Sequence, residues 1–162
     1  MSLILDTSNL TWFTASKTKP IFVRTWAEIF GPQVLFYSKN LLLKTLEANE
    51  PIDPEAVLCV GQSGDVWQQT AKAVDKKYEF VEYASYPQTG WAVYKPRDGN
   101  AVDAFEATQG GYIVGLWGEE VPALGAKNLQ RVKVGDFICR QPHDHNDQWV
   151  VQRNLFLNSY SY

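Results

Sequence analysis

A chain of 162 residues that is 45% hydrophobic and 20% charged has the composition of a folded globular protein, with the length of one ordinary domain or two very small ones. Its formal net charge of -3 provides no basic surface of the kind that binds phosphate backbones, so nucleic acid is not an expected partner. Two cysteines are too few for a disulfide framework, and the apolar runs are too short to cross a membrane. Because no signal-peptide pattern is present either, we expect a cytoplasmic protein with reduced thiols, the alternative being a Cys59–Cys139 disulfide.

The first half of the chain begins with an expected N-terminal arm over residues 1–18. Residues 21–26 are β-branched and aromatic and predict a strand, and residues 34–37 predict a second extended segment. Residues 41–50 predict the clearest helix, with Asn40 as its N-cap and Pro51 as its stop. A strand ending at Cys59, a turn over residues 62–65 and a returning strand then predict a hairpin, followed by a helix of about two turns.

The second half repeats this plan. In each half an apolar run ends at a cysteine, a polar loop leads to a tryptophan, and a tyrosine follows eleven residues after that tryptophan. The matched residues are Cys59, Trp67 and Tyr78 in the first copy and Cys139, Trp149 and Tyr160 in the second. We therefore predict two pseudo-repeats, over residues 19–86 and 91–162, each ending in a hairpin and a short helix that carries the tyrosine.

A family resemblance is carried by residues 94–162 and, more loosely, by residues 19–80. Tyr94-Lys95-Pro96-Arg97 precedes an extended Val-x-Ala-x-aromatic-like run at residues 101–105, and the chain closes with a Gly135-Asp136-aromatic strand, a hairpin and a Phe-x-x-x-Tyr helix. This arrangement resembles short phage and prophage proteins, including those with PGDYG-type domains. The resemblance implies a phage or mobile-element origin and no particular activity.

A cluster of potential metal ligands lies near the end of the second copy. Cys139, His143, Asp144 and His145 are all residue types that bind Zn²⁺, and a Cys–His pair could also provide a nucleophile. The competing interpretation is a buried structural cysteine followed by an exposed hairpin tip, because residues 141–147 are ordinary turn residues. The second interpretation is favoured, so no catalytic residue, metal or cofactor is expected.

Basic residues concentrate in the second copy and could serve a different chemistry. Together with Trp91, Tyr94 and Trp117 they could form a cationic and aromatic pocket for a nucleotide or another anion. The competing interpretation is a solvated surface. The residues concerned are Lys95, Arg97, Lys127, Arg131, Lys133 and Arg140.

These observations predict an α+β fold that is strand-rich, with two pseudo-repeated halves of antiparallel strands, a hairpin and a short helix, packed as one compact unit. The favoured function is non-catalytic: a phage or mobile-element protein that occupies a host macromolecule or ligand, as in host takeover or anti-defence. The alternatives are a small nucleotide- or anion-binding enzyme or sensor, and a virion or structural component; a homo-oligomer is compatible with each. The expected binding residues are Tyr94, Arg97, Tyr112, Trp117, His143 and His145.

Overall fold

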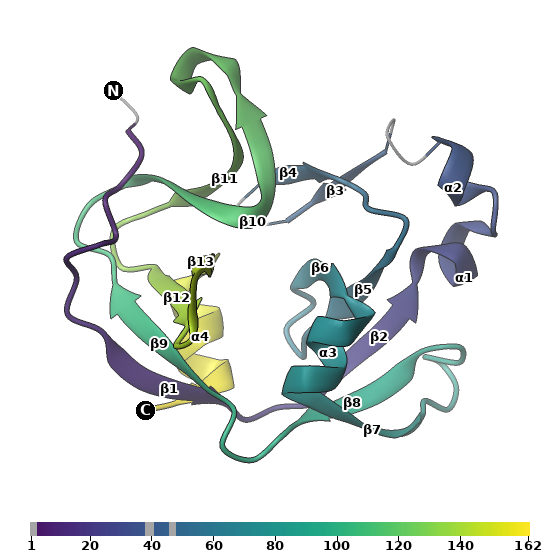
Figure 1. Ribbon diagram of the computed structural model, residues 1–162. Coiled ribbons are helices and arrows are strands. Elements are labelled where there is room, and N and C mark those ends of the chain that lie inside the picture. The colour runs from purple at the N-terminus through teal and green to yellow at the C-terminus, as the bar shows by residue number, and fades with distance from the viewer. Residues whose placement is uncertain (1–2, 38–40, 46–47) are drawn as a thin grey trace. The chain divides into compact units, whose positions relative to one another are not determined.

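Antiparallel strands dominate the computed structural model, which describes residues 3–37, 41–45 and 48–162 (Figure 1). The predicted strand-rich class with antiparallel sheets is therefore confirmed. The described residues form two compact units, each built on its own five-stranded sheet. Unit 1 contains residues 3–17, 48–50 and 101–162, and unit 2 contains residues 18–37, 41–45 and 51–100. Each unit thus takes residues from both sides of the predicted boundary at residues 87–90.

The sheet of unit 1 has the strand order β13-β12-β9-β1-β14. Its elements are β1 (Phe13–Lys17), β9 (Ala101–Glu106), β12 (Phe137–Gln141), β13 (Asp144–Val151), helix α4 (Arg153–Ser159) and β14 (Tyr160–Ser161). A separate antiparallel pair, β10 (Gly111–Val121) and β11 (Ala126–Val132), is joined by the 3-10 turn Pro122–Leu124. The predicted extended character of residues 111–117 is confirmed by β10.

The sheet of unit 2 has the strand order β6-β5-β2-β8-β7. Its elements are β2 (Ile21–Thr25), α1 (Trp26–Phe30), α2 (Val34–Tyr37), β5 (Ala56–Val60), β6 (Val66–Thr70), α3 (Ala71–Lys77), β7 (Tyr78–Tyr83) and β8 (Ala92–Pro96). A short two-stranded sheet is formed by β3 (Leu42–Lys44) and β4 (Asn49–Pro51). The predicted hairpin around Cys59 is confirmed by the β5–β6 pairing.

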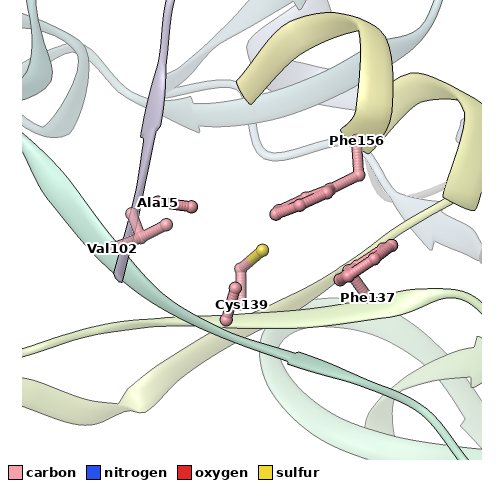
Figure 2. Packing of buried hydrophobic residues seen from close by; sticks show 6 residues of the cluster. Ala15, Val102, Phe137, Cys139 and Phe156 are labelled. Atoms are coloured by element: carbon pink, nitrogen blue, oxygen red, sulfur yellow. The ribbon is translucent and has the colours of Figure 1, made fainter. Parts of the chain in front are cut away.

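The core of unit 1 lies between its sheet and helix α4. Successive side chains of a strand point to opposite faces, and Cys139 and Phe137 therefore face α4 while Ile138 packs on the other side with Ile113 of β10. Figure 2 shows the Cys139 sulfur directed towards the Phe156 ring, which descends from α4. The Phe156 ring stacks on Phe137 with their centroids 3.9 Å apart. The cysteine is thus a small apolar filler in an aromatic core.

The core of unit 2 follows the same alternation. Ile21, Val23, Val57 and Cys59 face Val74 of α3, whereas Leu58 lies on the opposite face with the cluster around Trp26. Tyr78 closes the α3 side of this core and is 6% exposed. Burial is the main reason why the pKa of its phenol is raised above the ordinary value of 10.0.

Alkaline unfolding should report this buried phenol. Because the folded pKa of Tyr78 lies above the unfolded one, the folded state holds this proton more tightly, and stability is lost as the pH rises above about 10. We expect the urea concentration at the unfolding midpoint of the wild-type protein to decrease when the pH is raised from about 9 to about 11, a range centred on the ordinary tyrosine pKa. Tyr78→Phe, which cannot ionise, should show a smaller fall; an equal fall in both proteins would assign the effect to other groups.

The helix predicted over residues 41–50 is wrong, because the described part of this segment forms β3 and β4. Leu41 and Leu43 pack against the cluster of Trp26, Val34 and Ile52, whereas Leu42 is exposed. This alternation has the period of a strand, and the Ile52 backbone N–H donates to the Leu41 carbonyl across 3.1 Å. Burial of alternate leucines therefore outweighs their helical propensity. The predicted N-cap, Asn40, lies outside the described residues.

One further strand prediction in this region is wrong, because residues 34–37 form helix α2. The strand predicted over residues 21–26 is confirmed as β2, except that Trp26 begins helix α1. Thr25 and Glu28 form a capping box, in which the Thr25 hydroxyl accepts from the Glu28 N–H and the Glu28 carboxylate accepts from the Thr25 N–H. This Thr-x-x-Glu spacing is visible in the sequence and predicts a helix start at that place.

The two repeated helices are one residue shorter than predicted. Tyr78 and Tyr160 follow α3 and α4 in extended conformation and begin β7 and β14. Likewise, the predicted loop over residues 141–147 narrows to a turn at Pro142 and His143, because β13 begins at Asp144. Tyr78, Tyr160 and residues 144–147 all belong to paired strands. The local sequence gives no signal of that pairing.

Candidate functional site

Three aromatic side chains gather on the β7–β8 hairpin of unit 2. Phe80 lies directly opposite Tyr94, and their ring centroids are 5.7 Å apart at an interplanar angle of 72°. The Phe80 and Tyr83 rings are 5.1 Å apart at 61°. We call Phe80, Tyr83 and Tyr94 the aromatic surface. Of the six binding residues expected from the sequence, Tyr94 is the one that belongs to it.

A β-bulge explains why these rings meet. Residues three apart on a regular strand point to opposite faces, which would separate Phe80 from Tyr83. The pairing of β7 with β8 shifts register between Phe80 and Glu82, so one extra residue is accommodated and Tyr83 turns to the side of Phe80. Tyr94 joins the rings to the core of unit 2, and burial raises the pKa of its phenol.

The aromatic surface is largely open to solvent. Phe80 is 48% exposed and Tyr83 is 75% exposed, and Tyr86, in the loop after β7, is 89% exposed. Among the residues that the structure describes, β7 is the outermost strand of its sheet and pairs with β8 alone. A bulge and charged residues on an edge strand oppose unspecific strand pairing, and β7 has the bulge together with Glu79 and Glu82.

Arg97 directly follows β8, and its hydrogen bonds go to backbone carbonyls of helix α3. Its Nε donates to the Asp75 carbonyl across 2.8 Å, its backbone N–H donates to the Lys77 carbonyl, and its guanidinium pairs with Glu79 at 3.5 Å. Glu79 also accepts from Lys95 at 2.9 Å, and this hydrogen bond is the main cause of its lowered pKa. Arg97 therefore fastens the end of β8 to α3.

Tyr112 and Trp117 lie on β10, in unit 1. The side chains of Tyr112, Val114 and Leu116 alternate with the buried Ile113, and Val114 and Leu116 are 42% and 49% exposed. The Trp117 carbonyl accepts from the amide of the buried Gln130, whose oxygen accepts from the Val150 N–H of β13. A side chain at Gly115 would meet the Gln148 carbonyl, so glycine is required for β10 to approach β13. This part of β10 is thereby held in place.

His143 lies in the exposed β12–β13 turn of unit 1, and His145 lies at the exposed start of β13. His145 Nε2 is 3.1 Å from the Pro142 carbonyl, so its contact is with the adjacent turn. Cys139 is fully buried, so a thiolate nucleophile assisted by either histidine finds no support here. In the described part of the chain, no group of three or more His, Cys, Asp or Glu side chains is arranged to hold a metal ion.

The basic residues predicted to converge on an anion are mostly engaged by carboxylates. Lys95 and Arg97 share Glu79, Arg131 pairs with Glu119 at 3.6 Å, and Arg140 donates to Asp103 at 3.0 Å. Glu119 and Asp103 each offset the charge of one arginine, whereas Glu79 offsets one of the two charges of Lys95 and Arg97. Lys95 and Arg97 lie in unit 2, whereas Arg131 and Arg140 lie in unit 1.

The burial of the thiols leads to a direct prediction. Cys59 and Cys139 form no disulfide and are both 0% exposed, so the prediction that Cys139 is buried is confirmed and Cys59 is buried as well. We expect neither thiol of the native protein to react with Ellman's reagent within minutes, and both to react once urea has unfolded the chain. Rapid titration of either thiol in the native protein would contradict its burial, which Figure 2 shows for Cys139.

Sequence reasoning missed Phe80 and Tyr83. The available signal was the run Tyr78-Glu79-Phe80-Val81-Glu82-Tyr83, which is rich in strand-forming residues and directly follows the predicted helix. The bulge that turns two of its rings to one side has no sequence signal of its own.

Comparison with known proteins gives no further guide to the site: no protein-family model, no curated protein and no solved structure matches this chain. Within the described residues, no helix is both long enough and apolar enough to cross a membrane.

Proposed function

We propose that this protein is a non-catalytic binding protein whose contact with a host macromolecule is made by the aromatic surface of unit 2. The observation that carries the proposal is the exposure of Phe80 and Tyr83 in one group of contacting rings. Large aromatic side chains bury much apolar area at a low entropic cost, and they are enriched where binding energy concentrates. A protein is the class of partner that such a surface fits.

The chemistry around this surface supports binding over catalysis. Glu79, one of the two carboxylates adjacent to this surface in sequence, is paired with Lys95 and Arg97. A lowered pKa keeps Glu79 ionised and makes it a poor proton donor at neutral pH. The thiol of this unit, Cys59, is buried in the core. Glu79 and Cys59 are thus both engaged in the structure of this unit.

The proposed origin is a phage or mobile element, with action in the host cytoplasm. Its support is the resemblance of residues 94–162 to short phage and prophage proteins. Occupation of a host macromolecule is the simplest way for a small protein without a catalytic centre to act, and anti-defence is one such role.

We further propose that the two halves of the chain are pseudo-repeats. In unit 2 the hairpin β5–β6 carries Cys59 and Trp67 and is followed by the seven-residue helix α3 and the strand β7. In unit 1 the hairpin β12–β13 carries Cys139 and Trp149 and is followed by the seven-residue helix α4 and the strand β14. The cysteine and tryptophan are paired across each hairpin.

The experiment that tests the binding function compares capture by matched proteins. Immobilised wild-type protein, the Phe80→Ala/Tyr83→Ala variant and a Val114→Ala/Leu116→Ala control are incubated with lysate of the bacterial host, and bound proteins are quantified by mass spectrometry. The control loses two exposed apolar side chains of unit 1. A partner retained by wild type and control but lost by the first variant supports the proposal. Equal retention by all three proteins refutes this location.

A further inference from the structure

Two strands pair in the sheet of the half of the chain to which they do not belong in sequence. β1 lies in the predicted N-terminal arm, directly before the first repeat, and pairs with β9 and with β14, which both belong to the second repeat. β8, which opens the second repeat, pairs with β2 and with β7 of the first. Neighbouring strands along the chain usually pair with each other, but β1 and β2 are separated by only residues 18–20 and lie in different sheets.

Each of these strands fills an inner position. β1 lies between β9 and β14, with Phe13 opposite Ala104 and Ser16 opposite both Ala101 and Ser161. Ala15 is 1% exposed and belongs to the core cluster of Phe137, Cys139 and Phe156 (Figure 2). Without β1, the inner edge of β9 would lose its backbone hydrogen bonds, and this core would open. β8 occupies the corresponding place between β2 and β7.

An arginine of the receiving sheet holds a tryptophan at the start of each strand. Trp12 immediately precedes β1, and the Arg140 guanidinium of β12 lies 4.2 Å from its ring centroid while donating to Asp103 of β9. Trp91 immediately precedes β8, and the Arg24 guanidinium of β2 lies 5.9 Å from its ring centroid. Cation–π contacts of this kind contribute on the order of 1 kcal/mol and fix the position of the incoming strand.

We propose that the two halves of this chain exchange strands. Each five-stranded sheet accepts one inner strand from the other half of the chain, and a tryptophan directly precedes that strand. We call the position of the accepted strand in each sheet the slot. This inference rests on the proposed pseudo-repeats. The partner that fits the slot of unit 1 is residues 12–17, and the partner that fits the slot of unit 2 is residues 91–96. By the same pairing, the partner of a single repeat is a second copy of that repeat, as in a strand-exchanged dimer.

The test uses the full chain and paired cysteines. Ser16 and Ala101 are directly opposite each other, so Ser16→Cys/Ala101→Cys should form a disulfide within one chain when the folded protein is treated with oxidised glutathione at low micromolar concentration. Thr14→Cys/Ala101→Cys is the matched control, because its residues are two positions out of register and about 7–8 Å apart. The native cysteines are buried and should not compete.

Peptide mapping by mass spectrometry should find residue 16 linked to residue 101 in monomeric protein, with at least tenfold more cross-link than in the control. A second pair, Val23→Cys/Ala92→Cys, tests the pairing of β8 with β2 in unit 2. It replaces the first pair in the test if the first variant does not fold. A folded first pair that stays reduced, or one that links only between chains, overturns the proposal. This measurement needs no binding partner, so its failure is separate from failure of the proposed binding function.

Discussion

Replacing Phe156 by alanine is expected to lower the free energy of unfolding of unit 1 by about 3–5 kcal/mol, the usual cost of removing a buried phenylalanine side chain. Phe156 is 0% exposed and stacks on both Phe137 and Tyr160, with centroid distances of 3.9 Å and 4.7 Å. It is the residue through which α4 packs against the sheet, as Figure 2 shows. Urea titration followed by amide exchange in β12 measures this loss.

The neighbouring residue provides the control for this substitution. Leu157 also lies on α4 but is 40% exposed, so Leu157→Ala should cost much less than Phe156→Ala. Similar losses in the two variants would mean that α4 does not pack through Phe156. Amide exchange in β5 of unit 2 should respond less than that in β12, because Phe156 belongs to the core of unit 1.

Replacing Phe80 and Tyr83 together by alanine is expected to weaken binding of the captured partner at least about thirtyfold, because a single aromatic hot spot contributes on the order of 2 kcal/mol. Both side chains are exposed, so their loss should change the urea midpoint little. Calorimetric titration of the purified partner into each variant measures the affinity. Tyr94→Phe, which keeps the ring, should bind nearly as the wild type does.

The control for the binding experiment is Val114→Ala/Leu116→Ala, which removes two exposed apolar side chains from β10. Its affinity should stay within about threefold of the wild-type value. If this variant lost binding while Phe80→Ala/Tyr83→Ala kept it, the contact would lie on β10, near Tyr112 and Trp117.

Local patterns in the sequence correctly predicted the hairpins β5–β6 and β12–β13. An apolar run, a polar turn and a returning tryptophan define each hairpin, and the alternation within the run also places Cys59 and Cys139 in their cores. The leucines at positions 41–43 were misleading because a short run of one residue type fits both the helical and the strand period. Their state was decided by the cluster around Trp26, which is distant in sequence.

The candidate site was less accessible to sequence reasoning, because its geometry depends on pairing between distant residues. Tyr94 was singled out as aromatic, but its neighbour Phe80 follows from the register of β7 against β8. Arg97 was expected to bind an anion, and its actual partners, the Asp75 carbonyl and Glu79, are likewise set by that register. The pairing of β1 with β9, which is distant in sequence, has no local signal either.

The most direct test of the proposed function is the amide hydrogen-exchange footprint of the complex with the captured partner. Binding through the aromatic surface predicts slower exchange in β7 and β8, including residues 79–83, with β10 and the β12–β13 turn unchanged. The opposite footprint, with protection of residues 111–117 or 141–147 and none in β7 or β8, would contradict the assignment of binding to Phe80, Tyr83 and Tyr94.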